Sequence, residues 1–361
     1  MKKAPKKRTP CVLGAAALLT AAMALPALDF ASAEAAPDKT MIGFKFLDYA
    51  ESQALEGSSP TSVSGASGGS GISRILVHAF TVSTVVPVAG RWSVGMNYTL
   101  DTVSGASPQY HTSGLAKMSD RRNAEDVSVT RYFDLGTVTF GGSYSSESDY
   151  ISHGYSILGT RSTDDKNTTW SFGASLNDDT ISPTIPGAAS RSKKIYAGLA
   201  GVTWILTPND ITQFNLGFSH GSGYYSDPYK VSDNRPDTRN IATVLTRWNH
   251  HFDSSDGTAR ISYRFYTDSF GIRAHTLEGE YVQPVSRGWT LAPLLRLYSQ
   301  NEADFYIATS GPNEATPPPV PAGQVYSTFD QRLSAFGAMT AGIKVIKKLN
   351  DDVHFDTVLS G

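Results

Sequence analysis

Six charged residues in the C-terminal third fall on one face of consecutive predicted strands, namely Arg260, Arg264, Asp268, Glu278, Glu280 and Arg296. Side chains two residues apart share a face of an extended strand, whereas apolar residues between them, such as Ile261 and Phe265, take the other face. A parity-matched antiparallel register pairs Arg264 with Glu278 and Ser262 with Glu280. Such a ladder either holds a wall together through cross-strand ion pairs or lines a passage that selects solutes by charge and size. Both interpretations stay open.

Other reactive residue types lack the arrangement that their chemistry needs. The adjacent His250 and His251 point to opposite faces of a strand and cannot chelate one ion together. Ser269 and His275 could meet at a strand end, but a hydrolase also needs a third polar group close to them. We therefore assign no catalytic residue, no cofactor and no metal site.

The N-terminus has the pattern of an export signal. A basic segment at 2–8 precedes an apolar run from Val12 to Leu28 and the small residues Ala31-Ser32-Ala33, which predicts a signal peptide over 1–33 and a mature barrel domain over 34–361. An uncleaved anchor is the alternative. The single cysteine, Cys11, lies in the signal, so thiol chemistry is excluded from the mature chain.

Net charge argues against nucleic acid as a partner. The whole chain carries a formal charge of −2, and removing the five basic residues and one acidic residue of 1–33 changes it to −6. Nucleic-acid binding is typical of basic proteins or of proteins with clustered Lys and Arg.

The elements that position the charged ladder are strands. Alternation recurs over most of 34–361, for example from Trp92 to Leu100 and from Phe214 to Phe218, and beyond the signal no apolar run is long enough for a spanning helix. This pattern predicts an all-β, transmembrane, antiparallel up-and-down β-barrel of about 14–16 strands. A soluble all-β domain is the alternative.

Long connections alternate with short ones, which places five long loops on the outer side of a membrane: 52–71, 102–125, 178–193, 221–239 and 301–333.

Two features depart from a regular barrel. The count comes to about fifteen, an odd number where bacterial barrels have an even one; either the weak strand near 151–158 is miscounted or the last strand is missing. Arg131 alternates with Val127, Val129 and Phe133 on the apolar face, where a bulge or a position near the rim must accommodate its charge.

The segment ARISYRFYTDSFGIRAHTLEGEYVQPV, from Ala259 to Val285, and the segment WTLAPLLRLYSQNEADFY, from Trp289 to Tyr306, resemble the hallmark region of an uncharacterised bacterial family of outer-membrane β-barrels, a domain of unknown function. The resemblance implies the fold and the outer membrane as location. It implies no activity.

Two classes of function remain. The first is a porin-like channel, or a conduit or sheath for solutes or a partner; the second is an interaction or rim-enzyme role of the outward loops. The expected partners are outer-membrane lipid, the barrel-assembly machinery and a periplasmic partner protein.

Overall fold

A computed structural model describes residues 35–54, 71–106, 117–230, 232–308 and 319–361. Fifteen strands and one short 3-10 helix account for the regular structure: β1 (Met41–Ala54), β2 (Gly71–Val88), β3 (Trp92–Ala106), β4 (Lys117–Phe133), β5 (Gly136–Ser146), β6 (Tyr150–Ser162), β7 (Thr168–Ile181), β8 (Arg191–Thr207), β9 (Asp210–Gly223), β10 (Thr238–Phe252), β11 (Gly257–Asp268), β12 (Arg273–Ser286), β13 (Trp289–Gln300), η1 (Gln331–Leu333), β14 (Phe336–Lys348) and β15 (His354–Ser360). Within these residues, no helix is long and apolar enough to cross a bilayer.

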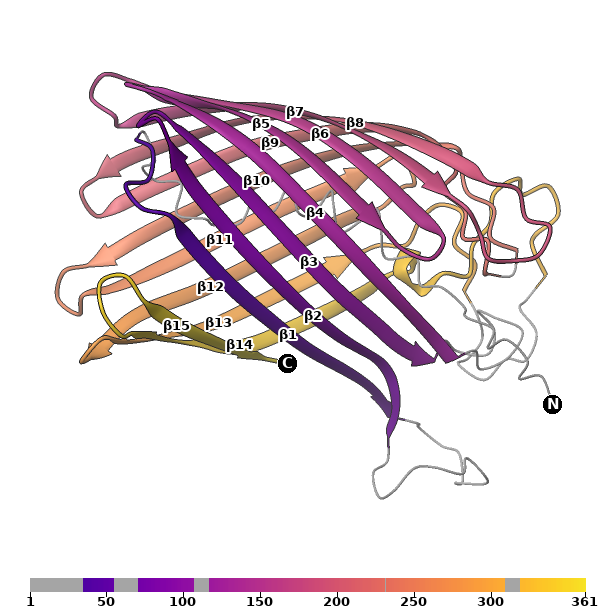
Figure 1. The fold of residues 1–361 in the computed structure, drawn as a ribbon. Helices are drawn as coiled ribbons and strands as arrows, with labels where there is room; N and C mark the ends of the chain where they lie inside the picture. Colours follow the sequence, from indigo (N-terminus) through magenta and orange to yellow (C-terminus); the bar gives the residue numbers. More distant parts are fainter. Residues whose placement is uncertain (1–34, 55–70, 107–116, 231, 309–318) are drawn as a thin grey trace, which may run out of the picture.

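The strands form one sheet in chain order, and each pairs antiparallel with the next. The sheet curls into a barrel whose first strand comes round towards its last (Figure 1). Within the described residues, β1 pairs with β2 and β15 pairs with β14, and the two edge strands are not hydrogen-bonded to each other. The expected all-β, up-and-down architecture of about 14–16 strands is confirmed, and the segment near 151–158 is a full strand, β6. That a last strand is missing stays a prediction.

Alternation sorts side chains between the two faces of the wall. On the outer face, Phe140 lies opposite Val129 on one side and Ile157 on the other, and such apolar side chains are open: Phe172 is 59% and Met339 70% exposed. The predicted alignments from Trp92 to Leu100 and from Phe214 to Phe218 lie on this face. The barrel therefore carries its large apolar residues outward rather than in a central core.

The inner face of the neighbouring strands carries small hydroxyl residues. Thr130 and Thr139 are hydrogen-bonded across β4 and β5 at 2.9 Å, and Thr137 and Thr160 across β5 and β6 at 2.9 Å. Short side chains pair across strands without filling the interior. This part of the wall is thus polar and lined by short side chains.

The seven connections at the left of Figure 1 are all short: 89–91, 134–135, 163–167, 208–209, 253–256, 287–288 and 349–353. The described parts of the long connections 182–190, 224–237 and 301–335 lie at the opposite end, which we call the long-loop end. Two short connections, 147–149 and 269–272, also lie at the long-loop end, so the sorting by length is not complete. The expected loop 102–125 was too wide, because β3 continues to Ala106 and β4 begins at Lys117; hydrogen-bonded pairing persists where both faces are polar and alternation no longer marks a strand. Most of the loop 52–71 and the predicted signal peptide lie outside the described residues.

Candidate functional site: a charged lumen and the loops at its mouth

The predicted ladder lies on the inner face, but its register differs from the predicted one by two residues. Arg260 pairs with Glu280, with Nη1 3.2 Å from Oε2, whereas Ser262 lies opposite Glu278 and Arg264 opposite Thr276. The predicted pairs Arg264–Glu278 and Ser262–Glu280 are therefore wrong, although their parity is right. The cause is the turn, which centres on Phe270.

Residue Asp268 ends β11 instead of contributing to the ladder. Its carboxylate accepts hydrogen bonds from the backbone N–H groups of Phe270 and Ile272, both at 3.0 Å, and from Arg239 Nε at 2.9 Å. Gly271 supplies the left-handed conformation, φ +88°, that closes this turn. Such local hydrogen bonds fix the turn and hence the register.

Glu278 instead reaches the next strand. Its Oε2 accepts a hydrogen bond from Arg296 Nε at 2.7 Å, and the two residues are direct cross-strand partners. Lys344 and Asp356 form a third inner ion pair at 3.3 Å, between β14 and β15. The structure thus shows three cross-strand ion pairs on the inner face of β11–β15, on β11–β12, β12–β13 and β14–β15.

Two arginines of the same wall have no carboxylate partner among the described residues. Arg264 lies opposite Leu245 and Thr276, and Arg247 lies opposite Gln213 and Ser262. Both are near the middle of their strands. The sequence interpretation missed Arg247, although its parity with Asn249 and Leu245 on the predicted strand 240–251 would have placed it on this face. The β10–β13 side of the lumen therefore has excess positive charge.

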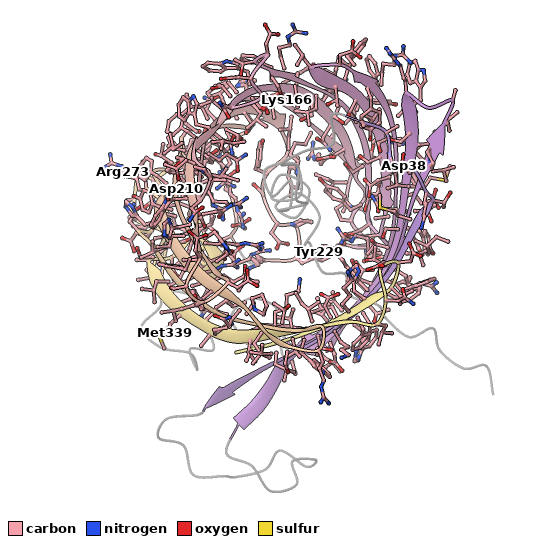
Figure 2. The ribbon with its side chains drawn as sticks, turned by 90° about the vertical axis from the view of Figure 1, so that its left-hand side faces the viewer. Asp38, Lys166, Asp210, Tyr229, Arg273 and Met339 are labelled. Atoms are coloured by element: carbon pink, nitrogen blue, oxygen red, sulfur yellow. The ribbon has the colours of Figure 1, made fainter. Side chains whose placement is uncertain are left out.

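A cap of inward-packed loops lies at the long-loop end. We define the cap as residues 224–230, 232–237, 269–272, 301–308 and 319–335. Its apolar cluster comprises Phe270, Ile272, Ala303, Phe305 and Leu333, with Tyr225, Tyr266 and Tyr306 packed against it. Figure 2 looks along the barrel from the short-turn end and shows Tyr229 of the cap within the ring, whereas Arg273 and Met339 project from its outer side. The cap therefore extends across the mouth of the lumen.

A buried ion network holds the cap together. Asp330 is 1% exposed and binds Lys230 Nζ at 2.8 Å, Arg235 Nη2 at 2.8 Å and Arg332 Nη2 at 2.6 Å. Burial alone would raise the pKa of Asp330, but the charges of Arg332, Lys230 and Arg235 outweigh it and hold the pKa far below its ordinary value. The carboxylate is thus ionised at any physiological pH. Arg235 also contacts Asp233 at 2.9 Å, which extends the network through the loop.

One tyrosine ties the cap to the far wall. The hydroxyl of Tyr229 donates to Asp149 Oδ2 at 2.7 Å and accepts from the backbone N–H of Thr184 at 2.9 Å. Asp149 lies in the β5–β6 turn beside Glu147. Burial, followed by the charge of Asp120, raises the pKa of Glu147 to about 8. Burial likewise raises the pKa of Asp149, against the lowering effect of its hydrogen bond from Tyr229.

The serine and histidine considered for hydrolysis have separate partners. Ser269 Oγ accepts from the backbone N–H of Asn240 at 3.0 Å, whereas His275 Nδ1 lies 2.7 Å from the Tyr263 hydroxyl on the outer face. The run Gly217-Phe218-Ser219-His220-Gly221 has nucleophile-elbow spacing, but it lies inside β9 rather than at a strand-to-helix turn. Neither set forms a catalytic arrangement.

All five tryptophans lie on the outer face at the short-turn ends of their strands, between 37% and 45% exposed: Trp92, Trp170, Trp204, Trp248 and Trp289. Arg131 extends over Trp92, with 4.9 Å from its guanidinium carbon to the ring centroid, and Lys347 lies 4.7 Å above Trp289. The predicted rim position of Arg131 is therefore what the structure shows, and cation–π contacts stabilise its charge there. We call this row the tryptophan girdle.

Family models match almost the whole chain, over residues 15–116, 114–192 and 185–360, and the family is described as "Protein of unknown function (DUF3570)". The chain belongs to this family. No curated protein matches it in sequence. Its fold is similar to the siderophore receptor PirA from Acinetobacter baumannii, at 9% identity and TM-score 0.46 over 90% of this chain and 52% of the receptor. It is also similar to an anion-selective porin from Comamonas acidovorans, at 10% identity and TM-score 0.39 over 74% of this chain and 91% of the porin. The chain thus spans about half the length of the receptor.

Proposed function

We propose that this protein is a bacterial outer-membrane β-barrel that forms a passive conduit with a preference for anions. The observation that carries the membrane location is the sorting of side chains: the large apolar residues point outward and stay exposed, and the ion pairs of β11–β15 point inward. An exposed apolar surface of this extent is stable in hydrocarbon and not in water. Outer-membrane lipid, the barrel-assembly machinery and a periplasmic partner protein remain predicted partners.

The aromatic rows support this orientation and thickness. Tyr196 and Trp204 both face outward on β8, 53% and 37% exposed, and lie eight positions apart. Eight residues span about 26 Å along a strand and roughly 20 Å along the membrane normal at a tilt of ~40°. An outer-membrane barrel has an apolar band of about 25 Å between aromatic girdles. The tryptophan girdle, with short turns behind it, then lies at the periplasmic interface.

The lumen supports the anion preference. The ion pairs Arg260–Glu280, Arg296–Glu278 and Lys344–Asp356 each cancel their own charge. Arg247 and Arg264, in contrast, lack a carboxylate partner among the described residues. They lie at mid-height, where a charge acts on every solute that passes. Fixed positive charge on a channel wall concentrates anions and excludes cations, and salt screens the effect.

Reversal potentials across planar bilayers test the proposal. With a salt gradient of KCl, the wild-type barrel should prefer chloride, and the double variant Arg247→Gln/Arg264→Gln should lose most of that preference while conductance persists. Arg273→Gln is the matched control, because it removes the same charge from the outer face. A folded barrel that never conducts would contradict the proposal of a conduit. Unchanged selectivity in the double variant would contradict the proposal that the two arginines cause the anion preference.

A further inference from the structure

Three carboxylates converge at the long-loop end, where the cap meets the wall. Asp120 comes from β4, and Glu147 and Asp149 come from the β5–β6 turn. One oxygen from each lies within 4.8 Å of the other two. We call this group the acidic triad. Like charges this close repel one another unless a proton or a cation lies among them.

Unpartnered buried oxygens are a second and separate sign of a ligand. Asp149 is 3% exposed, and its Oδ1 is buried without a hydrogen-bond partner among the described residues. Glu147 Oε2 and Asp120 Oδ2 are buried and unpartnered in the same way. Buried polar atoms are nearly always paired in proteins, so three orphan oxygens, one from each triad member, indicate a missing positive ligand.

Nearby cations do not fill this role. Arg122 acts electrostatically on Glu147, but its hydrogen bonds go to Asp101 Oδ2, from Nε at 2.8 Å and from Nη2 at 2.6 Å. Tyr229 donates to the other oxygen of Asp149, Oδ2. The unpartnered oxygens Asp120 Oδ2, Glu147 Oε2 and Asp149 Oδ1 are thus left without a hydrogen-bond partner among the described residues.

We propose that the acidic triad is a calcium-binding site. Calcium takes oxygen ligands at about 2.3–2.6 Å, so two ligands on opposite sides of the ion are about 4.6–5.2 Å apart. The mutual distances of the triad oxygens do not exceed 4.8 Å, so one calcium ion can contact all three, and the three carboxylates leave coordination positions for water. Magnesium needs near-ideal octahedral geometry at about 2.1 Å, which a triad carried by a strand and a turn does not enforce.

Calcium at this place would fix the cap as well as the turn. It would keep Asp149 ionised, and an ionised Asp149 accepts a stronger hydrogen bond from Tyr229. The ion would thereby link β4, the β5–β6 turn and the cap. This inference does not depend on conduction through the lumen, because the triad is defined by the wall and the turn alone.

Calorimetric titration of the full-length barrel in detergent tests the site, with Ca²⁺ alone as the probe after chelator treatment. Wild type should bind one ion saturably with a Kd of roughly 0.1–1 mM, the range of extracellular calcium modules, and its thermal unfolding should shift upward. Glu147→Gln/Asp149→Asn should weaken binding by at least about tenfold. Asp178→Asn is the matched control: it removes a carboxylate at the same end that pairs with Lys194 at 3.3 Å, and it should bind like wild type.

Heat-modifiable gel mobility establishes that each variant is folded, and Glu147→Gln alone serves if the double variant does not fold. Absence of saturable Ca²⁺ binding by folded wild type up to about 10 mM overturns the proposal. So does wild-type affinity in the triad variants, or tighter binding of Mg²⁺ than of Ca²⁺. Conductance is not measured, so these outcomes leave the conduit proposal untouched.

Discussion

Replacement of Asp330 by asparagine should open the cap without unfolding the barrel. Asp330 is 1% exposed, and its carboxylate binds Lys230, Arg235 and Arg332 at 2.8, 2.8 and 2.6 Å. Removing one partner of a buried ion network costs about 3–5 kcal/mol, because the remaining charges stay buried without compensation. Arg332 is 55% exposed at its side chain, so solvent screens its share. We take the lower end, about 3 kcal/mol.

A decrease of about 3 kcal/mol in the free energy of opening the cap corresponds to an increase of roughly 100-fold in the open population. Amide hydrogen exchange of segment 319–335 should therefore be faster by about two orders of magnitude in Asp330→Asn, with the strands unaffected. Asp304→Asn is the control in the same cap, since Asp304 is exposed and forms no ion pair with the described residues. Exchange within about threefold of wild type in Asp330→Asn, or equal acceleration in the control, would refute the reasoning.

Three further outcomes follow from the structure. The pKa of Glu147 is raised from 4.5 to about 8 in the folded state, so between these pH values the folded protein binds one more proton than the unfolded chain. In calcium-free buffer, the free energy of unfolding should therefore fall as the pH rises from about 4.5 to 8. Thermal melts of Glu147→Gln should show a weaker dependence on pH. Phe172→Arg places a charge on the lipid face and should cost about 2–4 kcal/mol in chemical unfolding from vesicles, whereas Ser171→Arg, one residue away on the lumen face, should cost much less; equal costs would contradict the assignment of faces. Gly271→Ala forces a side chain into a left-handed turn where its Cβ would lie within 2.1 Å of Asp304 Oδ1, so it should accelerate exchange in the cap, and wild-type protection there would count against the turn geometry.

Local alternation was enough to predict the strands and the faces of their side chains. The period of two is a property of each strand by itself, so residues such as Phe214 and Phe218 indicate their face without tertiary information. Register is not local in this sense: the two-residue error between Arg264 and Glu278 arose in a turn whose centre, Phe270, is fixed by packing into the cap.

The cap and the acidic triad could not be predicted from sequence for the same reason. Asp330 meets Arg235 across 95 residues of chain, and Asp120 meets Glu147 only because β3 and β4 extend beyond the alternating region. Contacts of that separation depend on how loops fold over a finished wall. Arg247, by contrast, lay within a correctly predicted strand and could have been assigned to the lumen.

The distance along the chain between the two halves of the cap also sets an order of events. Segment 224–237 leaves the wall after β9, and its partner 319–335 arrives only after β13, so four strands must be in place before the Asp330 network can form. While the barrel is being assembled, the mouth at the long-loop end is therefore open, and it can close once β10–β13 are in place, before β14 and β15 are added.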